Sequence, residues 1–130
     1  MPHVSLTEQD LQTVVHAFYD RVRRDPTLGP VFEDAVDDWP AHLDRLTAFW
    51  SSVMLSSGRY KGDPVGVHLR HLDRIRPEQF DLWLALWDRT TDDLLPAPAA
   101  LALQLRAARI ADSLKLALFF RLAPHPNKAA

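Results

Sequence analysis

The sequence predicts an all-α protein, and three observations support this prediction. Apolar residues recur at intervals of three and four along several stretches, which places them on one face of a helix. No stretch alternates apolar and polar residues in the way a half-buried strand does. Prolines and glycines fall between the periodic stretches. We therefore expect four long helices joined by short connecting pieces around an apolar core.

The first helix is expected over about residues 6–24. Ser5 and Glu8 have the spacing of a capping box, and Asp25 precedes a proline, which disfavours helical geometry there. The expected core stripe is formed by Leu11, Val14, Val15, Phe18, Tyr19 and Val22. Residues 25–40 follow with three prolines and one glycine, a composition that suits one or two short helical turns.

The second helix is expected from about Pro40 to Ser57. Asp38 can cap its start, and Gly58 can take the left-handed conformation that ends a helix. Its inward stripe, at i, i+4, i+7 and i+11, is formed by His42, Leu46, Phe49 and Val53. An imidazole thus lies in line with three apolar side chains.

Two further helices complete the prediction. Pro77 opens the third, which ends before the sequence LLPAP and carries Phe80, Trp83, Leu84 and Trp87 on one face. The last helix, over about residues 98–122, is rich in alanine and leucine. The polar tail at 124–130 is expected to fray.

Length and composition limit the classes of function. A chain of 130 residues with 47% hydrophobic content suits one domain, spanning 1–130, with a buried core. The net charge is −2 and both signs are scattered, so the basic stripe of a nucleic-acid binder is missing. The sequence has no cysteine, which excludes disulfides and thiolate metal ligands.

The sequence also gives an expectation about location. Its first ten residues lack the basic and then apolar pattern of a signal sequence, and no run of about 18 apolar residues occurs. We expect a cytoplasmic protein with neither a membrane nor a nucleic acid as partner.

Three polar side chains lie on core-facing stripes of different helices: Tyr19, His42 and Trp83. Each alone suits an ordinary structural role. Together in one interior, each O–H or N–H needs a partner, or burial costs about 1–3 kcal/mol. Three such groups predict an occupant of the interior.

The residues disfavour a metal held by side chains alone. No metal-binding His/Glu motif is found, and His68 and His71 lack an obvious third ligand. A flat apolar cofactor that brings its own metal needs a single imidazole, and haem meets this description. From residue types alone, a haem-free helical interaction module stays open, with Trp39, Trp50, Trp83 and Trp87 as core or interface residues.

Several motifs between about residues 17 and 118 resemble the truncated haemoglobins, and among them the group III branch. In order along the chain they are FY, LGPVF, FW, GRYKGDP followed by HL, and WL. The ordered set is far more specific than any single helix pattern.

The resemblance implies a two-over-two helical sandwich around a non-covalent b-type haem. It places the proximal iron ligand at His68, with His71 as the fallback, and the distal residues at Tyr19, His42 and Trp83. By analogy, Tyr19 and Trp83 donate hydrogen bonds to a bound ligand, while His42 gates the pocket.

Further contacts follow from the same resemblance. The residues expected to pack against haem are Phe32, Leu46, Phe49 and Trp50. The candidates for the haem propionates, by position only, are Arg59, Tyr60 and Arg70.

Two haem functions stay open at this point. One is binding of O₂, NO or CO as a carrier, sensor or buffer. The other is a redox enzyme, such as an NO dioxygenase or a peroxidase-like catalyst, and donors in the pocket favour ligand chemistry over O₂ storage. Since the sequence has no flavin or nicotinamide domain, any electron donor is expected to be a separate reductase.

Overall fold

The computed structural model describes residues 5–119, which contain six α-helices, one 3-10 helix and no strand. In chain order these elements are α1 Glu8–Arg24, α2 Leu28–Ala35, α3 Trp39–Leu55, α4 Pro64–Leu69, η1 Leu72–Arg74, α5 Pro77–Leu94 and α6 Ala97–Phe119. The predicted all-α class is confirmed. The predicted tail at 124–130, like the last turn of the final predicted helix, lies outside the described residues.

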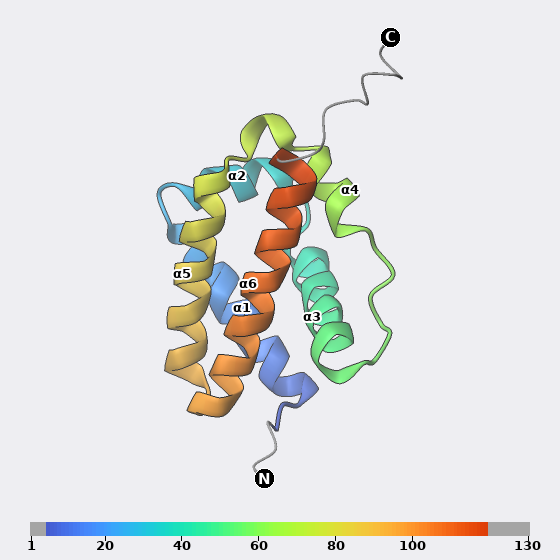
Figure 1. Cartoon of the computed structure of the whole chain (residues 1–130), viewed down its shortest axis with the longest axis vertical. Helices are drawn as coiled ribbons and strands as arrows, with labels where there is room; N and C mark the ends of the chain where they lie inside the picture. Colours follow the sequence, from blue (N-terminus) through green and yellow to red (C-terminus); the bar gives the residue numbers. More distant parts are fainter. Residues whose placement is uncertain (1–4, 120–130) are drawn as a thin grey trace.

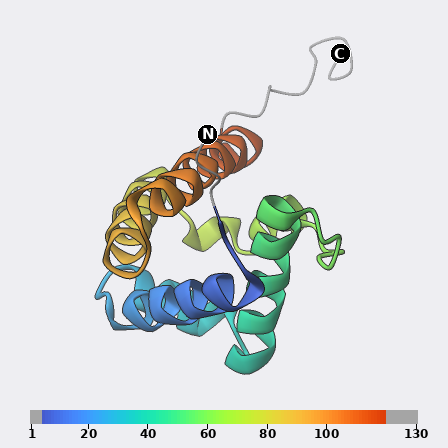
Figure 2. The same ribbon diagram turned by 90° about the horizontal axis from the view of Figure 1, so that it is seen from below.

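The four long helices form two pairs. α1 packs against α3, and α5 packs against α6. α1 also contacts α5 and so joins the two pairs, while α4 packs on α6 and α2 on α1 (Figure 1). Viewed from below, the α5 and α6 pair occupies one side and α1 with α3 the other (Figure 2). The arrangement is the two-over-two sandwich that the resemblance implies.

Trp87 connects all four long helices at the centre of the core. Its fully buried indole stacks on Trp50 of α3 at 4.6 Å and on Trp83 of α5 at 6.0 Å. It meets the ring of Phe18 of α1 edge-on at 4.9 Å. Its Nε1–H donates to the Leu103 carbonyl of α6 at 3.2 Å, so the buried N–H has a partner.

The start of α1 differs from the prediction. Thr7, not Ser5, is the N-cap: its hydroxyl accepts the Asp10 N–H at 3.1 Å, and the Asp10 carboxylate accepts the Thr7 N–H at 3.0 Å. The capping box predicted for Ser5 and Glu8 is therefore wrong. Glu8 instead pairs with Arg59, which removes its carboxylate from the cap.

The limits of α3 are close to the prediction. The Asp38 carboxylate caps the helix by accepting the Ala41 N–H at 3.1 Å, as expected. The helix ends at Leu55 because Ser56 takes the left-handed conformation with φ of 57°. Gly58 also has a positive φ, of 70°, but it lies beyond the residue that ends the helix.

The short helix α2 lies close to the end of α1. Gly29 is buried, and a Cβ at this position would lie 2.6 Å from the Arg23 carbonyl oxygen, so no larger residue fits without movement. The Asp25 carboxylate accepts the Leu28 N–H at 2.8 Å and holds the turn between the helices. This close approach is the physical reason for glycine in the LGPVF motif.

Across residues 5–119, none of the helices combines the length and the apolar character that spanning a bilayer requires.

Candidate functional site

His68 lies on the short helix α4, whose first turn is held by a side chain. The Asp63 carboxylate accepts the Gly66 N–H at 3.1 Å, and proline occupies the first helical position. A Cβ on Gly66 would collide with the same carboxylate. Glycine therefore leaves room for the cap, and the cap fixes the turn that presents His68.

The His68 ring has a defined tautomer. Its Nδ1 lies 2.6 Å from the Pro64 carbonyl oxygen, and since a carbonyl can only accept, Nδ1 carries the proton and Nε2 keeps a free lone pair. Burial lowers the pKa of His68; the hydrogen bond to Pro64 opposes the shift, and the nearby His71 adds to it. A neutral imidazole with a free Nε2 is the form that binds a metal.

An apolar cluster lies around α4. Its buried members are Phe80, Ala111, Leu114 and Leu118, and half-buried side chains packed against them include Val65, Leu69, Leu72 and Ile75. A larger cluster lies between α1, α3, α5 and α6, and only Leu84 and Ile110 belong to both clusters. The apolar interior of residues 5–119 thus has two parts, and His68 is on the side of the smaller one.

The larger cluster brings together the three polar residues singled out in the sequence. The Tyr19 and His42 rings meet edge-on at 5.8 Å, and Phe18 contacts both Tyr19, at 4.7 Å, and Trp83, at 5.5 Å. Burial raises the pKa of Tyr19 and a hydrogen bond with the Trp83 side chain partly opposes the rise, so that the pKa is about 12. Tyr19, His42 and Trp83 therefore form one group, as the sequence predicts.

His42 has a buried nitrogen without a partner. Its Nε2 is inaccessible to solvent and makes no hydrogen bond within residues 5–119. Burial, and to a smaller extent the charges of Arg45 and His68, lower the pKa of His42 to about 4. The charge of the His68 imidazole on α4 thus reaches His42 on α3, and with a pKa of about 4 His42 is neutral at pH 7.

Trp39 is a fourth polar residue of this group that the sequence analysis did not assign to it. Its ring lies 5.5 Å from that of His42 and 6.3 Å from that of Tyr19. Its Nε1–H is also buried without a partner in the described part of the chain. The Arg23 guanidinium lies over the indole, 4.4 Å from the ring centroid. The i, i+3 spacing of Trp39 and His42 is the signal that could have identified it.

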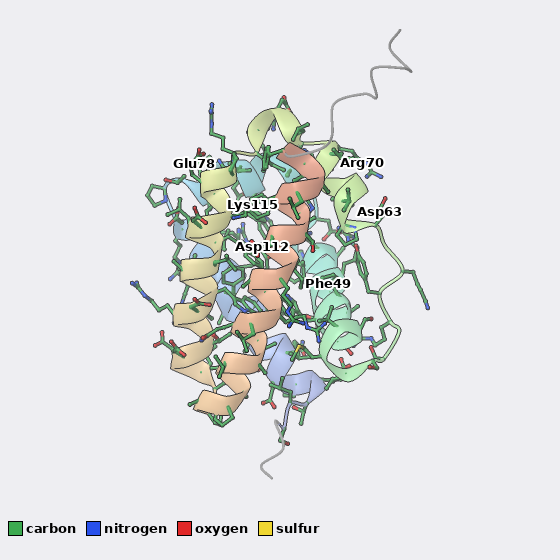
Figure 3. The ribbon with its side chains drawn as sticks, viewed as in Figure 1. Phe49, Asp63, Arg70, Glu78, Asp112 and Lys115 are labelled. Carbon is green, nitrogen blue, oxygen red and sulfur yellow. The ribbon has the colours of Figure 1, made fainter. Side chains whose placement is uncertain are left out.

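The predicted apolar contact residues lie in two different environments. Phe32 is half-buried and meets the Tyr19 ring at 5.6 Å, and Leu46 and Phe49 are half-buried on α3 (Figure 3 labels Phe49). Trp50 is only 1% exposed, and its stacking partner is Trp87 in the core. Phe32, Leu46 and Phe49 are therefore the members of this set that keep accessible apolar surface.

The predicted propionate partners are also placed differently from one another. Arg59 forms an ion pair with Glu8. Arg70 is exposed at the end of α4, opposite the Asp63 end (Figure 3). Tyr60 is half-buried and packs edge-on against Phe49 at 5.2 Å.

Arg45 is a cation near this site that the sequence analysis missed. Burial and then Asp63 raise the pKa of Tyr60, while Arg45 lowers it. The charge of Arg45 also acts on His42. The charge of this exposed guanidinium therefore reaches both Tyr60 and His42, and its i, i+3 spacing from His42 is the sequence signal for it.

These residues fit an apolar cofactor that carries its own metal. No three His, Asp or Glu side chains among residues 5–119 gather closely enough to hold a metal ion. A single imidazole with a free Nε2 lies on α4, while two buried nitrogens without partners, on Trp39 and His42, lie on α3. Half-buried apolar side chains supply the remaining surface.

Comparison with known proteins identifies the family. No protein-family model matches the chain. The group 3 truncated haemoglobin ctb of Campylobacter jejuni is 30% identical over 94 residues, which cover 69% of this chain and 73% of that protein. The crystal structure of the group III truncated haemoglobin from Campylobacter jejuni aligns with a TM-score of 0.80 and 27% identity, over 96% of this chain and 100% of that one. The chain belongs to the group III truncated haemoglobins.

Proposed function

We propose that the chain binds a b-type haem through His68 and takes up a diatomic ligand such as O₂, NO or CO on the side of Tyr19 and His42. The hydrogen bond from His68 Nδ1 to the Pro64 carbonyl is the observation that carries the proposal, because it leaves Nε2 free and unprotonated. When bound, haem supplies an iron with one open coordination position for such a ligand. His71, on the same turn, is the fallback ligand.

Tyr19 and Trp83 supply the hydrogen-bond donors. With a pKa of about 12, the Tyr19 hydroxyl keeps its proton at neutral pH and remains a donor. Donors in a buried, apolar setting stabilise partial negative charge on a bound ligand more strongly than donors in water. His42, which is neutral at pH 7, acts as the gate between this position and solvent.

The remaining contacts divide into apolar and polar ones. Phe32, Leu46 and Phe49 cover the cofactor faces and exclude water. Tyr60, Arg70 and Arg45 are the partners for the propionates. Arg59 is a weaker candidate, because Glu8 already neutralises its charge.

The ligand assignment is tested with His68→Ala and a matched His71→Ala variant. Visible spectra are recorded in the ferric and ferrous states, with and without CO. His68→Ala is expected to lose stable haem incorporation, while His71→Ala keeps the wild-type spectrum. An unchanged histidine-ligated spectrum in His68→Ala would overturn the assignment. Failure of the wild type to take up haem would favour the haem-free interaction module.

A redox reaction of the bound ligand is the second candidate function. The grouping of Tyr19, Trp83 and His42 favours it, since several polar groups hold O₂ too tightly for rapid release. Electrons would come from a separate reductase. We expect O₂ dissociation to accelerate in Tyr19→Phe and Trp83→Phe, by about tenfold for each 1.4 kcal/mol of lost stabilisation. No acceleration in either variant would contradict a donor role, and nitrate formed in proportion to NO consumed would favour the dioxygenase.

A further inference from the structure

The outward face of α6 carries large apolar side chains in contact with solvent. Leu101 is 54% exposed, Leu105 60% and Leu116 61%. The buried residues of the helix, among them Ala107, Ala111 and Leu114, lie on the opposite side. Figure 1 shows α6 at the front of the molecule, in front of α1, with no helix covering its outer side. Exposed leucines at helical spacing are typical of an interaction surface.

Two opposite charges lie within the same stripe. Arg109 and Asp112 fall between Leu105 and Leu116, and with Leu101 the positions are i, i+4, i+8, i+11 and i+15, which share one helix face. The Asp112 side chain is 74% exposed, and its contact with Lys115 is long, at 3.9 Å (Figure 3). Arg109 is exposed and makes no ion pair with another side chain of residues 5–119.

The charges and leucines of this stripe are complementary to those of a second, antiparallel copy of α6. The midpoint between residues 110 and 111 lies halfway between Leu105 and Leu116, and also halfway between Arg109 and Asp112. If two copies of α6 lie antiparallel about a twofold axis at this midpoint, Leu105 of each copy meets Leu116 of the other. The same register places Arg109 of each copy against Asp112 of the other.

We propose that two copies of the chain form a twofold dimer through the outer faces of α6. The twofold axis repeats each contact, so the interface contains two leucine pairs and two arginine–carboxylate pairs. The order of the charges and leucines is symmetric about the midpoint of the stripe. A second copy of the chain presents the same order in reverse, so it is the partner that this surface fits. The dimer leaves the proposed haem site uncovered, because α6 packs against α4 with its opposite face, which carries Ala111 and Leu114.

The interface is small, because each copy contributes one helix face. Interfaces below about 1,200 Å² are typical of weak and transient complexes. The dimer is therefore expected to form with rising protein concentration and to dissociate on dilution. The two ion pairs of the dimer fix the register of the two α6 helices, and its leucines bury apolar surface.

Charge reversal in the full chain tests the register. Sedimentation velocity over a hundredfold concentration range should show a monomer–dimer equilibrium for the wild type. Arg109→Asp or Asp112→Arg alone places like charges opposite each other and should weaken the dimer at least tenfold. The double variant should restore it. An equimolar mixture of the two single variants should form a heterodimer, because every pair in it is again of opposite sign.

Leucine variants test the apolar contacts. Leu105→Glu should leave the protein monomeric, while Leu55→Glu, at a 37% exposed leucine on α3, should dimerise like the wild type. Circular dichroism checks that each variant is folded. A wild type that stays monomeric throughout the range would overturn the proposal. So would a double variant that dimerises no better than either single variant, or equal loss in Leu105→Glu and Leu55→Glu.

Discussion

Tyr19 and His42 are adjacent, and burial favours the uncharged form of both. Their ring centroids are 5.8 Å apart, and the pKa of the phenol rises to about 12 while that of the imidazole falls to about 4. The two shifts have the same main cause, which is the loss of water around the charged form. At neutral pH the pair therefore presents a protonated phenol and a neutral imidazole.

The raised pKa of Tyr19 predicts a dependence of stability on alkaline pH. The pKa of the phenol is higher in the folded chain than its ordinary value of 10.0. Its contribution to the free energy of unfolding is therefore complete below pH 10. It is lost as pH rises from about 10 to about 12, a fall of about 2 to 3 kcal/mol in the free energy of unfolding. Urea unfolding of the haem-free chain at several pH values measures it. Tyr19→Phe should decline less steeply, and an identical decline in both would contradict the shift.

At the scale of elements, α4 is the helix on which the proposed ligand depends, and it has only six residues. Isolated helices of this length are unstable, so its geometry depends on the cap and on packing against α6. Asp63 and Gly66 together make that cap. Glycine generally weakens a helix, but at position 66 it leaves the space that the Asp63 side chain needs to cap α4.

A double-mutant cycle at Asp63 and Gly66 tests this dependence. Asp63→Ala should cost about 1 kcal/mol of stability through loss of the cap. Gly66→Ala should give no gain in the wild type, since the added methyl group displaces the carboxylate, yet should stabilise the Asp63→Ala background by about 0.5 to 1 kcal/mol. Chemical unfolding of the four proteins measures the cycle. Equal effects of Gly66→Ala in both backgrounds would show that the two residues are independent.

At the scale of the whole molecule, the apolar interior is divided between two clusters. Trp87 holds the larger one together through contacts with α1, α3 and α6, and Leu84 and Ile110 link it to the smaller one. The proposed apolar haem contacts, Phe32, Leu46 and Phe49, belong to the larger cluster, while the proposed ligand, His68, lies on α4, which packs with the smaller one. A cofactor bound to both would connect parts of the fold that otherwise share few side chains.

This arrangement predicts that haem stabilises the whole fold. A ligand that binds only the folded state adds about 3 kcal/mol when its free concentration is about 100 times its Kd. For a chain of this size that gain raises Tm by roughly 10 °C. Thermal unfolding of haem-loaded and haem-free wild type measures it, with His71→Ala as the control that keeps the gain. His68→Ala should lose most of the difference, and a haem-independent Tm in the wild type would contradict the prediction.

Much of the fold could be predicted because helices depend on local patterns. The limits of α3 and α5 follow from Asp38, Pro77 and the apolar periodicity, and the structure agrees to within two residues. The cap of α1 could not be chosen locally, because Ser5 with Glu8 and Thr7 with Asp10 have the same spacing. Arg59, far along the chain, pairs with Glu8, so the choice depends on a contact that the local sequence does not contain.

The sequence by itself determined the helices, their apolar faces and the identities of the polar residues directed inward. Only the tertiary structure decided which polar atoms lack partners, as on Trp39 and His42. It also decided that the charge of one cation, Arg45, acts on residues of two separate segments, His42 and Tyr60. The physical reason is the distance along the chain over which each effect acts. Periodicity and capping act over one or two turns of one helix, whereas burial and electrostatic influence depend on side chains brought together from separate helices.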